Sequence, residues 1–282
     1  MILIADSGST KTEWRLIDAD GSISQIKSAG INPYYQDEKE VMSLLQEGLS
    51  AHLHLPVDKI YFYGAGCSSD ANKQKMTECF QSLYPNASIE IDTDLLAAAR
   101  SLCGHERGIA CILGTGANSC LYDGVSVVEN IAPLGYIMGD EGSGAYFGNK
   151  LLGDYLRKDL PQNLIDRMDK RFDLSKSIIL ENVYQNAMPA RYLAGFSKFI
   201  FQNLKEPYLY KMIYDGFVLF FEKNIMKYTD YKNEAVNFTG SVSFYYSNIL
   251  RKVAADLGIH LRHIVEGPIA GLTLYHQKEI EK

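Results

Sequence analysis

The sequence has little of what marks membrane proteins and nucleic-acid-binding proteins. No apolar run approaches the ~20 residues that a membrane-spanning helix needs, and the first residues, MILIAD, enter an apolar strand with no basic leader. Lysine and arginine never form a block longer than a pair, and the formal net charge is −6. An acidic chain binds nucleic acid and anionic membranes poorly. We therefore expect a soluble cytoplasmic protein whose partners are small molecules, not nucleic acid and not a membrane.

Cysteine is scarce and irregularly spaced. The five cysteines are Cys67, Cys79, Cys103, Cys111 and Cys120. Their number is odd and no two of them form a C-x-x-C pair, which argues against a disulfide framework and against a zinc site. We expect them to pack in apolar cores. The 282 residues, 46% of them hydrophobic, are enough for two domains of about 100 to 150 residues each.

Two glycine-rich turns organise the middle of the chain, within residues 108–147. The first turn, at 113–117, follows an apolar run, and the other, at 139–144, opens into a helix. Because glycine has no Cβ, such turns let backbone N–H groups approach an anion, as phosphate-binding loops require. The two turns indicate nucleotide chemistry, and we expect each of them to offer bare N–H groups.

The strand pattern around the first of these turns also occurs at the start of the chain. Both halves begin with a strand, a polar glycine turn, a second strand, an Asp-Gly turn and a third strand. The predicted strands are residues 2–6, 13–17 and 23–27 in the first half and 109–113, 119–123 and 125–129 in the second. The repetition predicts two homologous domains. The alternative is coincidence, because glycine turns join strands in many proteins.

Helices alternate with the remaining strands, which is typical of an α/β protein with mixed sheets. The spacing of apolar residues predicts helices at 41–53, 71–83, 145–156 and 247–257, a mostly helical stretch at 174–227 and a terminal helix after residues 264–272. It predicts strands at 59–63, 88–93 and 235–239, and a turn at 240–243. An aromatic stripe from Tyr210 to Ile225 is expected to be core. Small residues near the start of the terminal helix permit a close backbone approach.

Taken in chain order, the motifs resemble one superfamily over nearly the whole sequence. They are DSGSTKTE, Asn32, DTDLLAAA, LGTGANS, MGDEGSGAYF, RYLAGF and TGSV. This set is similar to the sugar kinase, Hsp70 and actin superfamily and, within it, to the N-acetylglucosamine kinase branch and the related BadF/BadG/BcrA/BcrD type ATPases. The resemblance implies two ribonuclease H-like domains in an actin-like arrangement with an interdomain cleft. It implies an N-terminal domain at 1–106, with a terminal helix at about 267–282 that packs back on it, and a C-terminal domain at 107–266 with a helical insertion at about 150–232.

The resemblance also implies ATP and Mg²⁺ as cofactors. Asp6 ends the first strand, where open α/β sheets place ligands, and it is expected to bind Mg²⁺ through water. The alternative is a carboxylate that only caps the turn. The residues expected to contact the nucleotide are Gly8, Ser9, Thr10, Gly114, Thr115, Gly116, Gly240 and Ser241.

Asp94 is the residue that the family match implies as catalytic base. It follows the strand at 88–93 where a helix begins, and a carboxylate there could accept the proton of a substrate hydroxyl that attacks the γ-phosphate. The alternatives are that Asp94 is only a helix N-cap, or that Asp92 is the base. The residues expected to contact the sugar are Asn32, Asp94, Gly135 and Asp140. For Asn32 and Asp140, turn formation is the alternative role.

One stretch departs from the family pattern. Where those kinases carry Gly-Gly-Trp-Gly ahead of the GDEGS motif, this chain has Ala132-Pro133-Leu134-Gly135, so the wall of the sugar pocket is altered. We predict an ATP-dependent kinase that phosphorylates an amino sugar, most simply N-acetylglucosamine at its 6-hydroxyl. The alternatives are a BadF-type ATPase that activates a partner enzyme, and a non-catalytic sugar or nucleotide sensor. The sequence leaves a homodimer open.

Overall fold

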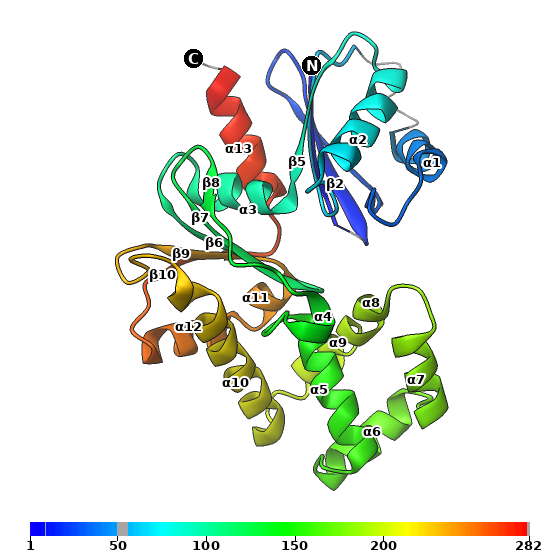
Figure 1. The fold of residues 1–282 in the computed structure, drawn as a ribbon, viewed down its shortest axis with the longest axis vertical. Helices are drawn as coiled ribbons and strands as arrows, with labels where there is room; N and C mark the ends of the chain where they lie inside the picture. The colour runs from blue at the N-terminus through cyan, green and yellow to red at the C-terminus, as the bar shows by residue number, and fades with distance from the viewer. Residues whose placement is uncertain (9, 50–55, 281–282) are drawn as a thin grey trace. The chain divides into compact units, whose positions relative to one another are not determined.

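The computed structural model describes residues 1–8, 10–49 and 56–280, which form two compact units (Figure 1). Unit 1 comprises Met1–His105, Gly124–Ser126 and Gly267–Lys282, and unit 2 comprises Glu106–Asp123 and Val127–Glu266. Each unit has a five-stranded sheet and a hydrophobic core of its own. The predicted α/β fold class is confirmed.

The sheet of unit 1 has the strand order β3-β2-β1-β4-β5. Its strands are β1 (Ile2–Ser7), β2 (Lys11–Ile17), β3 (Ile23–Ala29), β4 (Lys59–Gly64) and β5 (Ser88–Thr93). The first three are antiparallel neighbours, whereas β4 and β5 run parallel to β1. The carboxyl ends of β1, β4 and β5 therefore meet at one edge, which is where parallel sheets place their ligands.

Helices cover both faces of this sheet. They are α1 (Glu38–Leu49), α2 (Asp70–Leu83), α3 (Asp94–Cys103) and α13 (Ile269–Ile280). The apolar sides of α1 and α2 share one core with Trp14 and Phe62. On the other face, His276 of α13 stacks on Tyr61 of β4. A Cβ on Gly271 of α13 would lie 2.5 Å from the carbonyl oxygen of Ser101 in α3, so the predicted close backbone approach is confirmed.

The sheet of unit 2 has the order β10-β9-β6-β7-β8. Its strands are β6 (Gly108–Leu113), β7 (Ala117–Tyr122), β8 (Val127–Glu129), β9 (Val236–Thr239) and β10 (Leu261–Val265). Read from β8 to β10, the order matches that of unit 1 strand for strand, with three antiparallel strands followed by two parallel ones. The structure thus confirms the repeated plan that the sequence predicts.

Most of the helices of unit 2 come between β8 and β9. They are α4 (Gly135–Met138), α5 (Gly144–Arg157), α6 (Gln162–Arg171), α7 (Lys176–Tyr184), α8 (Pro189–Ala194), α9 (Ser197–Gln202), α10 (Pro207–Lys223) and the 3₁₀ turn η1 (Ile225–Lys227). The remaining two are α11 (Ser241–Tyr245) and α12 (Ser247–Asp256). Within the described parts of both units, no helix has the length and apolar character to cross a bilayer.

The aromatic stripe of α10 is core for most of its length. Phe217, Phe220 and Phe221 are fully buried, and Phe217 meets Phe147 of α5 edge to face. The prediction is wrong for Tyr210, which is 37% exposed because the first turn of α10 lies at the surface. The five cysteines are buried, as predicted.

Two local predictions need correction. The segment predicted as a turn at 240–243 enters the short helix α11, in which the Phe244 N–H donates to the carbonyl oxygen of Gly240 at 3.0 Å and the Tyr246 N–H to that of Val242 at 3.1 Å. The strand β10 was not predicted, because the sequence LRHIV of this edge strand has little apolar alternation. The end of the helix predicted at 41–53 lies outside the described residues.

Candidate active site

A hydrogen bond of Gly8 links the end of β1 to the start of β2. Gly8 donates its N–H to the carbonyl oxygen of Lys11 at 3.0 Å. Below the turn, the buried Ser7 hydroxyl donates to the carbonyl oxygen of Ile31 at 2.9 Å and lies 2.7 Å from Thr12 Oγ1. Thr10 is exposed at the tip, where a ligand could reach its hydroxyl. Ser9, also predicted to contact the nucleotide, lies outside the described residues.

Asp6 and Asp94 come together at the carboxyl edge of the unit 1 sheet. Asp6 pairs across the sheet with Tyr63 of β4, which pairs with Asp92 of β5, and Asp94 follows two residues later. Burial, the Asp94 carboxylate and Glu13 raise the pKa of Asp6 to about 7, while Lys11 opposes this. Burial also raises the pKa of Asp94, although backbone N–H groups at the start of α3 partly counter it. Two adjoining half-buried carboxylates favour a cation beside them.

Asp94 is not the N-cap of α3. That position belongs to Thr93, whose Oγ1 accepts a hydrogen bond from the Leu96 N–H at 3.2 Å. Asp92, the other alternative, is held by Lys73 of α2 at 3.0 Å, and its Oδ1 also accepts from the Thr93 N–H. Thr93, not Asp94, is thus the N-cap of α3, and Asp92 is paired with Lys73. The role of Asp94 as base stays a prediction.

Asn32 forms a compact turn beside this edge of unit 1. Its side chain is 7% exposed, and its Oδ1 accepts a hydrogen bond from the Tyr34 N–H at 3.1 Å. Its carbonyl oxygen accepts from the N–H groups of Tyr35 and Gln36. The turn-forming role is confirmed, and the sugar contact stays a prediction.

In unit 2 the two glycine-rich turns are joined to each other. Gly114 donates its N–H to the carbonyl oxygen of Gly116 at 3.0 Å, which closes the first turn. Gly144 and Ala145, at the start of α5, donate to the carbonyl oxygens of Gly114 and Thr115 at 2.8 and 3.0 Å. The expectation that both turns offer bare N–H groups is therefore wrong for Gly114 in the first turn and for Gly139, Ser143 and Gly144 in the second, because each of these N–H groups donates to a backbone carbonyl oxygen. The amides of Gly144 and Ala145 hold the first turn in place, and Ser143 is the predicted N-cap of α5.

Asp140 lies against the first glycine turn. Its backbone is in the left-handed region, with φ +59°, and its Oδ1 accepts a hydrogen bond from the Ala117 N–H at 3.2 Å. A Cβ on Gly116 would lie 3.0 Å from Asp140 Oδ2, so glycine lets the carboxylate approach. Burial and the neighbouring Glu141 raise the pKa of Asp140, and the hydrogen bond from Ala117 lowers it. One carboxylate oxygen thus holds the loop in place, and no local pattern in the sequence indicates this contact.

Gly240 ends β9 with its backbone pressed against the end of β6. Its φ is +116°, and a Cβ there would lie 2.3 Å from the carbonyl oxygen of Leu113. Only glycine fits such a position. Leu113 is the residue before the first glycine turn, so the structure brings Gly240 and the Gly114 turn together. Ser241, next to Gly240, is exposed.

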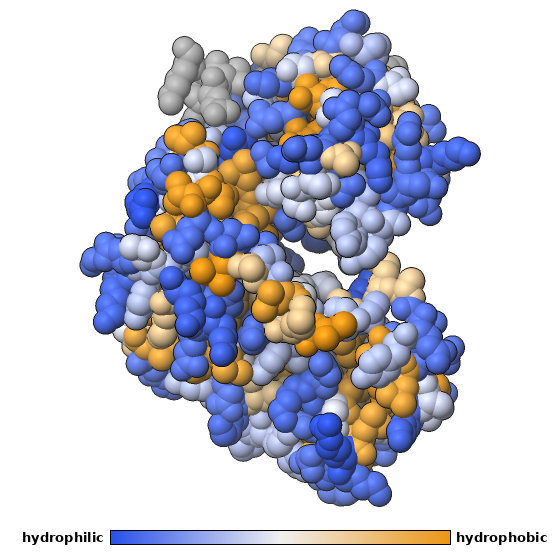
Figure 2. All heavy atoms as spheres, viewed as in Figure 1, coloured by the Kyte–Doolittle hydropathy of each residue, from blue (hydrophilic) through white to orange (hydrophobic). Residues whose placement is uncertain are grey.

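The segment before Asp140 exposes several apolar side chains. Leu134, Ile137 and Met138 are 53%, 78% and 71% exposed, and α4 buries none of its residues. Orange and tan spheres gather in Figure 2 where Figure 1 places α4. Gly135 begins this helix with φ +70° and is exposed. The stretch in which the chain departs from the family pattern is therefore an open apolar surface.

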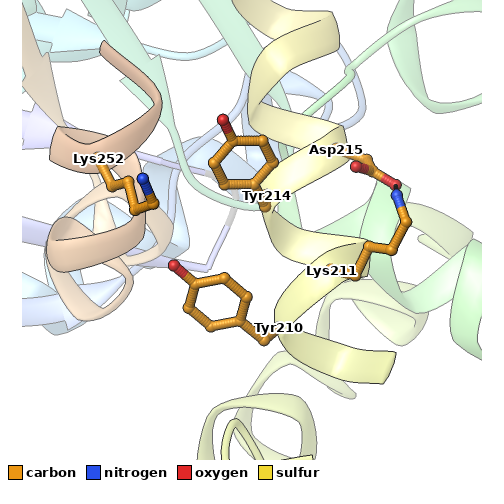
Figure 3. Close-up of a pocket in the computed structure, with 5 residues that line it drawn as sticks. All are labelled: Tyr210, Lys211, Tyr214, Asp215 and Lys252. Atoms are coloured by element: carbon orange, nitrogen blue, oxygen red, sulfur yellow. Dashed lines mark hydrogen bonds and ion pairs between the residues drawn. The ribbon is translucent and has the colours of Figure 1, made fainter. Parts of the chain in front are cut away.

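A hollow of about 300 Å³ lies elsewhere on unit 2, between α10 and α12 (Figure 3). Tyr210 and Tyr214 point from α10 toward Lys252 of α12. Lys252 pairs with Asp256 at 2.9 Å, and Lys211 pairs with Asp215 at 2.6 Å. Because both lysines are neutralised, this hollow offers no free cation for a phosphate and is not part of the site.

Over the described residues, no cluster of three or more His, Cys, Asp or Glu side chains could hold a metal ion. Mg²⁺ in phosphoryl-transfer enzymes is commonly held by one or two carboxylates together with the substrate phosphates and water. The pair of Asp6 and Asp94 fits that pattern, because each carboxylate raises the charge density at this edge and the pKa of Asp6 is raised in part by Asp94.

No family model and no curated protein matches the chain, but many solved structures do. One is a candidate N-acetylglucosamine kinase from Porphyromonas gingivalis, with 39% identity over 99% of this chain and 100% of that one, and a TM-score of 0.94. A candidate N-acetylglucosamine kinase from Chromobacterium violaceum is 17% identical over 97% of this chain and 98% of that one, with a TM-score of 0.67.

A ROK hexokinase from Thermus thermophilus matches at 12% identity over 100% of this chain and 99% of that one, with a TM-score of 0.51. This match and the one from C. violaceum support the fold alone. The match from P. gingivalis goes further, because its identity extends over both units. The chain belongs to the N-acetylglucosamine kinase family, a branch of the sugar kinase, Hsp70 and actin superfamily.

Proposed function

We propose that this protein is an ATP-dependent carbohydrate kinase that transfers the γ-phosphate of ATP to a hydroxyl of an amino sugar, most simply the 6-hydroxyl of N-acetylglucosamine. The observation that carries the proposal is the pair of adjoining carboxylates, Asp6 and Asp94, at the edge of the unit 1 sheet. Family membership supports the reaction class. The particular sugar rests on the printed name of the relative from P. gingivalis.

Asp94 is the proposed general base. The sugar hydroxyl oxygen attacks the γ-phosphorus, its proton passes to the Asp94 carboxylate, and the bond from the γ-phosphorus to the β,γ-bridging oxygen breaks to release ADP. Burial raises the pKa of Asp94 above its ordinary value, toward neutral pH. That shift suits a base that must be ionised at rest and must still take up a proton.

Asp6 is the proposed Mg²⁺ carboxylate, acting through water. Its raised pKa shows that a negative charge is unfavourable there without a cation. When bound, Mg²⁺ would neutralise charge on the transferred phosphoryl group. Because Asp94 is one of the groups that raise the pKa of Asp6, a cation at Asp6 would also help to keep Asp94 ionised.

In this proposal, unit 2 contacts the phosphates of ATP through backbone N–H groups and not through charged side chains. The turn at Gly114, Thr115 and Gly116 would bind phosphate oxygens, and its shape is fixed in advance by the two amides of α5. Such preorganised donors need no rearrangement during the reaction. Gly240 and Ser241 would contact the adenosine side of ATP. The carboxylate oxygen of Asp140 that does not accept from Ala117 would bind a sugar hydroxyl.

A coupled ADP-release assay tests the proposed function. It compares N-acetylglucosamine, N-acetylmannosamine, glucosamine and glucose with a reaction that contains no sugar. We expect stimulation by at least one amino sugar and the strongest response to N-acetylglucosamine. ADP release that is rapid without sugar and unchanged by every sugar would point to an ATPase. Sugar binding in a calorimeter with no ADP release would point to a sensor.

A further inference from the structure

The loop between β3 and α1 in unit 1 presents two adjacent tyrosines to solvent. Tyr34 is 71% exposed and Tyr35 is 72% exposed. Their rings pack edge to face, with centroids 5.0 Å apart and an interplanar angle of 80°. Large aromatic groups exposed side by side commonly mark a binding surface.

The loop that carries these rings is held firmly. The Asn32 N–H donates to Gln36 Oε1 at 2.7 Å, and the Tyr34 N–H donates to Asn32 Oδ1 at 3.1 Å. Lys75 reaches across from α2 and donates from its Nζ to the carbonyl oxygens of Pro33 and Gln36, at 2.7 and 3.0 Å. Donation from a charged group strengthens both contacts. The two tyrosines are therefore displayed by a preorganised loop.

The loop cannot fold away beneath the rings. A Cβ on Gly66 would lie 2.1 Å from Asn32 Oδ1 and 3.1 Å from Tyr34 Cβ, so the loop already rests directly on the backbone after β4. Displaying two rigid rings costs little additional conformational entropy when a ligand binds. This is the property expected of a recognition surface.

The chemistry of the loop favours a carbohydrate as its occupant. From Ser28 to Gln36 the sequence SAGINPYYQ carries no charged side chain. Lys75 of α2 donates to the backbone of this stretch. Nucleic acid and other polyanions require basic side chains, which residues 28–36 lack. Aromatic rings beside amide groups suit a pyranose, which has apolar C–H faces and a rim of hydroxyls.

We propose that Tyr34 and Tyr35 form a second sugar subsite, which takes a pyranose ring attached to the sugar that is phosphorylated. The proposal rests on the proposed function and on the predicted contact of the phosphorylated sugar with Asn32. The substrate class is then a disaccharide or other glycoside of an amino sugar whose 6-hydroxyl is free. Asn32 connects the two subsites, since its side chain accepts from the Tyr34 N–H.

The test compares KM for N-acetylglucosamine with KM for N,N′-diacetylchitobiose by coupled ADP release. For the wild type we expect a KM for the disaccharide that is about fivefold lower. Tyr34→Ala and Tyr35→Ala should remove this preference and leave the KM for the monosaccharide nearly unchanged. Tyr34→Phe should keep it, because stacking needs the ring and not the hydroxyl. Tyr184→Ala is the matched control, because Tyr184 is 80% exposed on α7 of unit 2.

Three results would overturn the subsite. The first is a wild type with equal KM values for the two sugars. The second is a rise in both KM values in the Tyr34 and Tyr35 variants. The third is a loss of self-association in those variants, measured by light scattering, which would assign the tyrosines to a second copy of the chain. If no sugar stimulates ADP release, the proposed function fails, and calorimetry of disaccharide binding to the wild type and to Tyr34→Ala still decides the subsite.

Discussion

The two units share one strand plan and use it for different chemistry. In each, a glycine follows the first strand and donates its N–H to a carbonyl oxygen further along the chain: Gly8 donates to Lys11, and Gly114 donates to Gly116. At the strand ends, unit 1 carries the carboxylates Asp6 and Asp94. At the matching edge, unit 2 carries glycine and backbone amides. The duplicated fold keeps its backbone, while the residues at the strand ends set the chemistry of each unit.

The carboxyl edges of the two sheets also differ in their electrostatics and hydrogen bonding. At the edge of unit 1, burial raises the pKa of Asp6 and of Asp94, and the Asp94 carboxylate raises that of Asp6 further. The edge of unit 2 is nearly satisfied, because its turns bond to each other and Asp140 braces the first of them. In the proposed function, unit 1 gains a cation and moves a proton, whereas unit 2 keeps a fixed shape. The four predictions below test this contrast, from the largest expected effect to the smallest.

The largest effect is expected from the base in unit 1. Asp94→Asn should lower kcat by about 10³-fold, with little change in either KM, because general-base catalysis contributes on this scale. Asp92→Asn is the control, and it should change kcat by less than about threefold, because Asp92 only pairs with Lys73. Coupled ADP release measures both. Near-normal turnover of the Asp94 variant would show that the base assignment is wrong.

The next effect concerns the backbone of unit 2. Gly240→Ala should lower the free energy of unfolding by roughly 3 kcal/mol, because its Cβ would strike the Leu113 carbonyl oxygen and its φ is positive. Gly258→Ala should lower it by only about 1 kcal/mol, because Gly258 has φ +68° but no neighbour within 4 Å. Urea unfolding followed by circular dichroism compares them. If both variants lost the same free energy of unfolding, packing against β6 would not be the reason that position 240 requires glycine.

The charge of Asp6 should make stability depend on pH. The folded pKa is about 7 and the ordinary value is 3.8, so between these pH values the folded chain keeps a proton that the unfolded chain has lost. Stability contributed by this proton is present at low pH and is lost as the pH rises through 7. From pH 5 to pH 8, the wild type should lose roughly 2 kcal/mol more than Asp6→Asn. Parallel stability curves for the two proteins would contradict the raised pKa.

The smallest effect is a feature that the two units share. Thr93 caps α3 and Ser143 caps α5, each by accepting a backbone N–H three residues on. Thr93→Ala and Ser143→Ala should each lower the free energy of unfolding by about 1 kcal/mol, and Thr93→Ser should be nearly neutral. Thermal unfolding of the three variants measures this. If one alanine variant loses several times more unfolding free energy than the other, the two caps are not equivalent. The two units would then share their strand order but not their helix caps.

Much of the fold follows from local sequence signals. The strand predicted at 88–93 has the same bounds as β5. The alternation of apolar and polar residues stops at Asp94, and this predicted that Asp94 lies where the strand gives way to a helix. The strand β10 was not predicted, because an edge strand need not alternate apolar and polar side chains. The sequence offered Asp94 as a possible N-cap of α3, but the N-cap is Thr93, one residue earlier. Both Thr and Asp can cap a helix, and only the folded structure shows which of them does.

The sequence by itself determined the duplicated strand plan, the glycine turns and the acidic strand end, because these depend on residues close together in the chain. Only the tertiary structure decided what each group touches. It paired Lys73 with Asp92, set Asp140 against Gly116 and used the amides of α5 to hold the Gly114 turn. Such contacts join residues that are 19 to 30 positions apart, and their geometry depends on how helices and strands pack. Local sequence patterns do not predict that packing. The contacts at the site were therefore decided by the tertiary structure.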